Sequence, residues 1–151
     1  MSDSGYRRER VLAIDYGERR VGLAVSNPDY DFVSGLPTLD RKTLKGSLVA
    51  AIGEIVVERG VERVVLGIPY TMEGEEGPQA REVRAFQAEL ESTLEVPVAE
   101  WDERLTTEAA RRALREAGHT DRTMRERLDQ LAAVLMLESW LRRRAVDRGG
   151  S

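Results

Sequence analysis

The chain has 151 residues, of which 41% are hydrophobic, so it has the size and apolar content of one globular domain. It has no cysteine and no apolar run near the roughly 18 residues of a membrane span, which excludes disulfide-stapled and membrane-spanning classes. Its formal net charge of -4 argues against a protein that coats nucleic acid non-specifically, because such binding depends on basic groups that neutralise phosphates. We expect a single cytoplasmic domain over residues 10–146, with flexible tails at 1–9 and 147–151.

The first predicted element is a β-hairpin close to the N-terminus. The apolar run 11–14 is typical of a strand that is buried on both faces, and it ends on the carboxylate of Asp15. Gly17 follows in a turn, where it can take a positive φ angle, and residues 21–25 form the second apolar run. Gly22 lacks a Cβ, so another backbone, a metal shell or a phosphate can approach the second strand. Asp15 therefore either caps an ordinary turn or serves a functional site.

The following segments predict a mixed sheet with a helical crossover. Residues 32–39 read as a third strand that completes a meander. Between 43 and 59 the apolar residues recur at three- and four-residue intervals, which predicts an amphipathic helix closed by Gly60. Residues 61–68 form the next strand, and the helical crossover should lay this strand parallel to the first one.

A long glycine-rich loop follows this strand. It covers twelve residues, 67–78, and Pro78 suits the first turn of a second helix. Loops at the carboxyl edge of parallel strands bind ligands in open α/β sheets, and twelve residues is long for a plain connection. Residues 97–101 are the last predicted strand, and two carboxylates, Asp102 and Glu103, follow it directly.

The C-terminal part is predicted to be helical. Thr106 is a suitable N-cap for a helix that ends at Gly118, and residues 119–127 read as a polar connection. The last helix, 128 to about 144, contains the run Leu131-Ala132-Ala133-Val134-Leu135-Met136-Leu137, which is apolar on every face and predicts deep burial. Asp129 lies one turn before this run. It is either an exposed first-turn acid that favours the helix dipole or a group held over the strand ends.

Three acids thus occupy comparable places: Asp15 after the first strand, Glu103 after the last strand, and Asp129 at the start of a helix on the sheet. If their carboxylates converge, they cannot all stay ionised without a counter-ion. Such a site either raises a pKa or binds a divalent cation. All-oxygen ligands favour Mg²⁺ or Mn²⁺, and one or two such ions can promote in-line displacement at a phosphodiester.

Four motifs resemble those of the YqgF family, also called RuvX, whose members are relatives of the RuvC Holliday junction resolvases in the ribonuclease H-like superfamily. The motifs follow the family order, cover nearly the whole chain, and are more specific together than singly. They are Asp15-Tyr16-Gly17 with Arg20 and Gly22, Leu66-Gly67-Ile68-Pro69 with Met72 and Gly74, Asp102-Glu103-Arg104-Leu105-Thr106-Thr107, and Asp129 with Ala132-Ala133. The chain departs from the family pattern at Glu18 and Thr71, where the family usually has a basic or neutral residue and an asparagine. Glu18 would weaken the attraction for phosphate.

The resemblance implies an α/β fold, namely a ribonuclease H-like mixed five-stranded sheet of order 3-2-1-4-5 flanked by helices. It also implies an acidic metal site at Asp15, Glu103 and Asp129, and a role in processing the 5′ end of pre-16S ribosomal RNA. We therefore predict a nuclease dependent on Mg²⁺ or Mn²⁺ in which these three acids are catalytic and Asp15 bridges. Its substrate-binding residues are predicted to be Arg20, Arg104, Thr106 and Thr107, whereas Arg143 is expected to contribute little.

The expected partners are nucleic acid, with RNA favoured over branched DNA, and ribosome precursors. We expect no membrane association and a monomer or homodimer. Two alternatives stay open: a Holliday junction resolvase that acts on branched DNA, and a non-catalytic module that binds RNA or protein. A strand-Asp-x-Gly hairpin also opens actin-like ATPases and sugar kinases, but those need two domains around the nucleotide, and 151 residues hold one.

Overall fold

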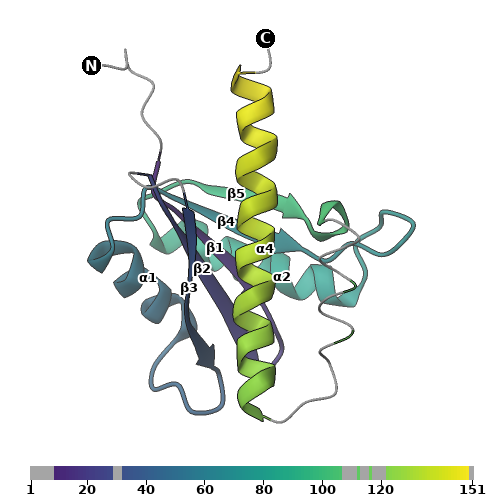
Figure 1. Cartoon of the computed structure of the whole chain (residues 1–151). Coiled ribbons are helices and arrows are strands. Elements are labelled where there is room, and N and C mark those ends of the chain that lie inside the picture. Colours follow the sequence, from purple (N-terminus) through teal and green to yellow (C-terminus); the bar gives the residue numbers. More distant parts are fainter. Residues whose placement is uncertain (1–8, 29–31, 107–111, 113–115, 117–121, 150–151) are drawn as a thin grey trace.

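The computed structural model describes residues 9–28, 32–106, 112, 116 and 122–149. Within these residues the chain forms a sheet with helices on both of its faces (Figure 1). None of the helices in the described ranges combines the length and apolar character that crossing a bilayer requires. The elements are β1 (Val11–Tyr16), β2 (Arg20–Asn27), β3 (Phe32–Asp40), α1 (Leu48–Glu58), β4 (Arg63–Ile68), α2 (Pro78–Thr93), β5 (Val98–Asp102), the short 3-10 helix η1 (Glu103–Leu105) and α4 (Arg122–Gly149).

The strand order is β3-β2-β1-β4-β5, which confirms the predicted 3-2-1-4-5 order. β1 to β3 form an antiparallel meander, and β4 and β5 lie parallel to β1. Parallel strands bring their carboxyl ends to one edge of the sheet. That edge therefore carries the end of β1 with Asp15, the loop after β4, and the Asp102-Glu103 junction after β5.

The sheet is covered on both faces. Among the described elements, α1 and α2 pack on one face, and α4 crosses the other (Figure 1). Along β1 the side chains alternate between the two cores: Leu12 and Ile14 join the core under α1 and α2, while Val11 and Ala13 join the core under α4. This double burial explains the unbroken apolar run at residues 11–14, as the sequence predicted.

Two glycines of the hairpin allow close backbone approach. A Cβ at Gly22 would collide with the carbonyl oxygen of Asp129 and would lie 3.6 Å from Cβ of Ala133, so the backbone of α4 rests directly on β2. Gly17 does not adopt the expected positive φ; a Cβ there would instead collide with the carbonyl oxygen of Arg20, across the turn. The requirement for glycine at position 17 is thus steric rather than conformational.

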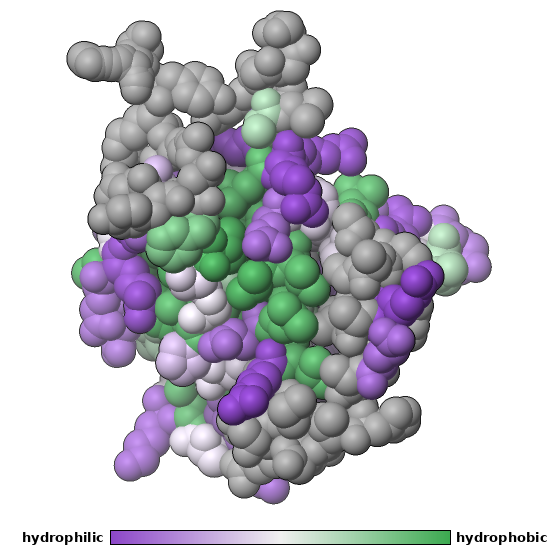
Figure 2. Space-filling view, viewed as in Figure 1, coloured by the Kyte–Doolittle hydropathy of each residue, from purple (hydrophilic) through white to green (hydrophobic). Residues whose placement is uncertain are grey.

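The observed α4 differs from the predicted last helix. It begins at Arg122 rather than Leu128 and continues to Gly149, so residues 122–127 are helical rather than a connection, and 147–149 are helical rather than a tail. Its apolar run is buried on one side only: Ala133, Met136 and Leu137 are buried, whereas Leu131 is 37% exposed. Figure 2 shows apolar side chains at the surface over the middle of this helix.

The other boundaries shift less. α1 begins five residues later than predicted, because Ser47 caps it: the Ser47 hydroxyl accepts a hydrogen bond of 3.0 Å from the backbone N–H of Ala50. The helix predicted after Thr106 is described only at residues 112 and 116, which are helical. The expectations for Thr107, Gly118, residues 119–121 and the termini 1–8 and 150–151 lie outside the described residues.

Candidate active site

The end of β1 and the junction after β5 bring two carboxylates together. Asp15 is the next-to-last residue of β1, and Glu103 is the first residue of η1. Their side chains form a hydrogen bond in which Glu103 donates its proton to Asp15. The two strands are separated by β4 in the sheet, so the Glu103 side chain reaches across β4 to meet Asp15.

Gly67 of β4 creates the space that the Glu103 side chain needs. A Cβ at position 67 would lie 2.6 Å from Oε2 of Glu103 and 2.8 Å from Sδ of Met136 on α4. Neither separation is compatible with ordinary packing. Glycine at this position therefore lets the carboxylate pass between the sheet and α4.

We expect Gly67→Ala to reduce catalysis much more than stability. The added methyl group must displace the Glu103 carboxylate, and a displacement of about 1 Å in a catalytic group can cost on the order of 10²-fold in rate. Cleavage rates and urea unfolding of the variant measure the two effects. Gly53→Ala in α1 is the matched control, because its Cβ meets only Cδ2 of Leu94 at 3.8 Å. A fully active Gly67→Ala protein would show that the Glu103 position is not critical.

The pair lies in an environment that opposes ionisation. The pKa of Glu103 is raised to about 8, first by loss of hydration and then by the negative charge of Asp15, the hydrogen bond to Asp15 and the negative charge of Asp102. Burial also raises the pKa of Asp15. The hydrogen bond from Glu103 lowers this pKa, and the negative charge of Asp129 raises it further. Near neutral pH the two carboxylates therefore share one proton.

Asp129 lies near this pair, but it is held by an arginine. Its Oδ2 accepts a hydrogen bond of 2.7 Å from Nε of Arg20, the first residue of β2, and both side chains are partly exposed. Because α4 begins at Arg122, Asp129 lies two turns inside the helix, and the alternative of a first-turn acid that favours the helix dipole is wrong. Its charge nevertheless acts on Asp15, as the effect on the pKa of Asp15 shows.

The expected convergence of three carboxylates is thus incomplete. Within the described ranges, no three acids, histidines or cysteines lie close enough to form a ready-made metal shell. Two carboxylates that share a proton are nevertheless a suitable donor set for a hard divalent cation, which replaces that proton and removes the repulsion. Asp15 and Glu103 fit such an ion, and Asp129 can join them if its carboxylate turns from Arg20.

The residues on either side of η1, Asp102 and Thr106, make contacts of their own. Asp102 faces away from the pair: it caps η1 by accepting from the backbone N–H of Arg104 at 2.9 Å, and it binds the Arg104 side chain at 2.7 Å. Adjacent residues at a strand end point to opposite sides, as expected. Thr106 ends η1, and its hydroxyl lies 3.5 Å from Nε1 of Trp101.

The loop after β4 is held in place by an arginine that sequence reasoning missed. Arg84 of α2 donates to Glu76 at 3.1 Å, to the Tyr70 hydroxyl at 2.9 Å and to Glu100 of β5 at 2.6 Å. The loop, α2 and β5 are thus tied to one guanidinium. Arg84 is one of several charged residues in α2. The helical pattern of the sequence does not distinguish it from the others, so it gave no signal for this role.

A small cavity opens on the α2 side of Glu103. It has a volume of about 270 Å³ and lies between the hairpin turn, including Glu18, and the N-terminal part of α2, including Glu82. Its acidic lining repels a bare phosphate. A cation at the carboxylate pair would offset this repulsion.

Comparison with known proteins adds independent evidence. Residues 9–143 match the family described as RuvX, Holliday junction resolvase. A protein of Chloroflexus aurantiacus named "Putative pre-16S rRNA nuclease" is 43% identical over 131 residues, which cover 87% of this chain and 85% of that relative. A protein of the same name from Koribacter versatilis is 40% identical over 139 residues, covering 92% and 90% of the two chains.

The fold also matches a solved structure. RuvC of T. thermophilus in complex with a Holliday junction substrate aligns with a TM-score of 0.54 and 20% sequence identity, and the alignment covers 88% of this chain and 95% of that chain. At this level of identity the similarity concerns the fold alone, and it agrees with the ribonuclease H-like sheet order described above.

Proposed function

The chain belongs to the RuvX family, and from this membership we infer that it is a nuclease, a phosphodiester hydrolase whose catalytic centre is the carboxylate pair at the carboxyl edge of the sheet. The single observation that supports this location is the hydrogen bond between Asp15 and Glu103, two acids brought together from β1 and η1. A protein that uses its acids only as caps has no need of such a pair, because two buried carboxylates destabilise the fold.

We propose that Asp15 and Glu103, completed by Asp129, would hold Mg²⁺ or Mn²⁺. Where two ions bind, Asp15 would be the ligand common to both. When bound, the ion supplies a Lewis acid at the scissile phosphate and makes a water acidic enough to attack it. The carboxylates orient that water through their remaining oxygen atoms. Gly67 and Met136 keep the Glu103 side chain in place, and α4 shields one side of the pair from solvent.

We propose that Arg20 and Arg104 contact substrate phosphates. Among the described contacts, Arg20 bonds to Asp129 through its Nε alone. The two terminal nitrogens of Arg20 can therefore still bind a phosphate oxygen. Arg104 similarly uses Nε and one terminal nitrogen for Asp102. Thr106 and Thr107, at the end of η1 and just after it, are proposed to bind a phosphate oxygen through their hydroxyls.

The substrate that we propose is the 5′ region of pre-16S ribosomal RNA within ribosome precursors in the cytoplasm, with the protein acting as a monomer or homodimer. The names of the relatives support RNA. Branched DNA is the second candidate, because the family description is that of a Holliday junction resolvase. A non-catalytic binding role is the third possibility that the experiment must exclude.

The deciding experiment compares labelled pre-16S 5′-leader RNA with a four-way DNA junction as substrates of the purified protein. We expect the RNA to be cut with Mn²⁺ or Mg²⁺ and to remain intact with a chelator. Cleavage of the junction alone would support the resolvase. Absence of cleavage of both substrates with either ion would overturn the assignment as a nuclease.

A further inference from the structure

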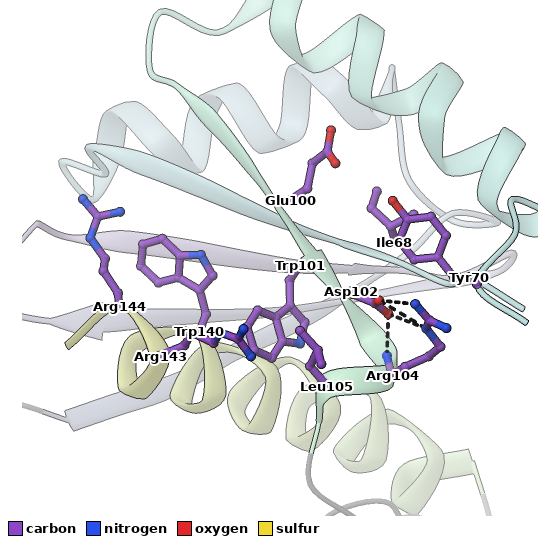
Figure 3. A pocket seen from close by; sticks show the side chains of 11 residues that line it. Ile68, Tyr70, Glu100, Trp101, Asp102, Arg104, Leu105, Trp140, Arg143 and Arg144 are labelled. Atoms are coloured by element: carbon purple, nitrogen blue, oxygen red, sulfur yellow. Dashed lines mark hydrogen bonds and ion pairs between the residues drawn. The ribbon is translucent and has the colours of Figure 1, made fainter. Parts of the chain in front are cut away.

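A larger cavity lies beside the carboxylate pair, on the side of β5 (Figure 3). It has a volume of about 650 Å³, within the range of small-molecule pockets. The loop after β4 contributes Tyr70, β5 contributes Trp101, η1 contributes Arg104 and Leu105, and α4 contributes Trp140 and two arginines. Asp102 and Arg104, the two sequence neighbours of Glu103, line the cavity, whereas Asp15 and Glu103 themselves do not.

The cavity combines flat apolar surfaces with guanidinium groups. Arg104 lies over the Tyr70 ring, with Cζ 5.5 Å from the ring centre, and Arg144 lies over the Trp140 ring at 4.8 Å. Figure 3 shows these two stacks at opposite ends, with Trp101 and Leu105 between them. Leu105 is 46% exposed and adds an apolar surface to the lining.

The charges of the lining are mostly paired, and one arginine remains available. Arg104 is bound to Asp102, Glu100 to Arg84, and Arg144 to Glu9 at 3.0 Å. Arg143 is exposed and makes no hydrogen bond or ion pair with any residue in the described ranges. It therefore offers a free cation at the rim, although the sequence led us to expect only a small contribution from it.

We propose that this cavity binds an unpaired base of the substrate strand next to the scissile phosphate, with Arg143 on the adjoining phosphate. This inference rests on the proposed nuclease function and extends it to a preference for single-stranded nucleic acid. Exposed bases of single strands stack on aromatic rings and guanidinium planes, and both kinds of surface line the cavity. Bases inside a duplex are already stacked and paired, so their faces cannot enter.

The chain carries its own probe for this site. Its two tryptophans, Trp101 and Trp140, both line the cavity, so tryptophan emission reports on its occupancy. We expect a single-stranded RNA 12-mer, titrated into the wild-type protein in chelator and low salt, to quench this emission. A hairpin-closed duplex of the same composition should not. Anisotropy of a labelled 12-mer measures total binding in parallel.

Two variants test the lining. Arg143→Ala should weaken 12-mer binding about three- to fivefold, the effect of one exposed charge contact. Leu105→Asp should weaken it on the order of tenfold, because the new carboxylate repels phosphate and replaces an apolar surface. The matched controls are Val57→Asp on α1 and Arg59→Ala at its C-terminal cap, where both side chains are exposed on the opposite face of the sheet. The controls should bind like the wild type.

Each contrary result overturns the inference in a distinct way. Binding by anisotropy without quenching places the strand elsewhere, and absence of binding rejects the site. Equal quenching by the duplex removes the single-strand preference. AMP that binds as tightly as the 12-mer identifies a free-nucleotide site instead. The cleavage assay with Mn²⁺ is read separately: cleavage without quenching refutes only the cavity assignment, and quenching without cleavage refutes the nuclease function.

Discussion

Glu103→Gln and Asp15→Asn should each reduce metal-dependent cleavage to the background rate, a loss on the order of 10³-fold or more. Each substitution removes one of the two carboxylates that share a proton, and the neutral amide that replaces it is a weaker ligand for a hard cation. Asp102→Asn should cost about tenfold at most, because Asp102 caps η1 and binds Arg104 but faces away from the pair. Single-turnover rates in saturating Mn²⁺ measure these losses.

The comparison needs folded proteins. Circular dichroism and urea unfolding verify that the variants keep the native state, and Glu54→Gln on the exposed side of α1 serves as a charge-matched control with wild-type activity. Equal losses from Asp102→Asn and Glu103→Gln would count against the proposed roles of these two neighbours.

The metal-free protein should lose stability as the pH rises from about 4.5 to about 8. Burial and the nearby charges raise the pKa of Glu103 to about 8 in the folded state, so between these pH values the folded state binds more protons than the unfolded state. The free energy of unfolding therefore falls with increasing pH and levels off above 8. At about 1.36 kcal/mol per pKa unit, a shift from 4.5 to about 8 corresponds to a loss on the order of 5 kcal/mol.

With the proposed metal site, added Mn²⁺ should reverse this loss, because an ion held by the pair would replace the shared proton and would bind only the folded state. The increase in melting temperature should be larger at pH 8 than at pH 6. Asp15→Asn should lose most of the metal response, and Glu103→Gln should flatten the pH dependence in chelator. Melting curves at the two pH values, with and without Mn²⁺, give both answers. A variant at Asp15 that is destabilised yet keeps the wild-type metal response would identify Asp15 as a turn cap and reject the metal site.

The strands and their order were predictable because their physical signals are local. A fully apolar run such as 11–14 requires cover on both faces, and a helical crossover requires a parallel neighbour. Together with the family motifs, these signals were enough to place Asp15 and the Asp102-Glu103 pair at one edge. Alternation of side chains at a strand end lets only one of Asp102 and Glu103 face the site, and the family resemblance indicated Glu103.

What the sequence could not provide depends on contacts between distant residues. The Arg20 partner of Asp129 lies 109 positions away, so sequence alone indicated a third converging acid where the structure has an ion pair. The start of α4 was missed because residues 122–127 are polar apart from Met124 and carry no apolar period. The outer face of α4 was predicted to be buried, because the run 131–137 is apolar on every side. Such a run does not indicate which side of the helix packs on the sheet.

The unbroken course of α4 across the sheet has a consequence for how this protein tolerates change. Asp129 near the carboxylate pair and Trp140 in the larger cavity are eleven positions apart on the same helix, about 16 Å at 1.5 Å per residue. The contact of its backbone with Gly22 fixes the helix on β2, so a residue inserted or deleted between them would rotate everything beyond it by about 100°. Trp140 would then leave the cavity while Asp129 stayed in place. Residues 130–139 can therefore vary in identity on the outer face of α4, but their number cannot change.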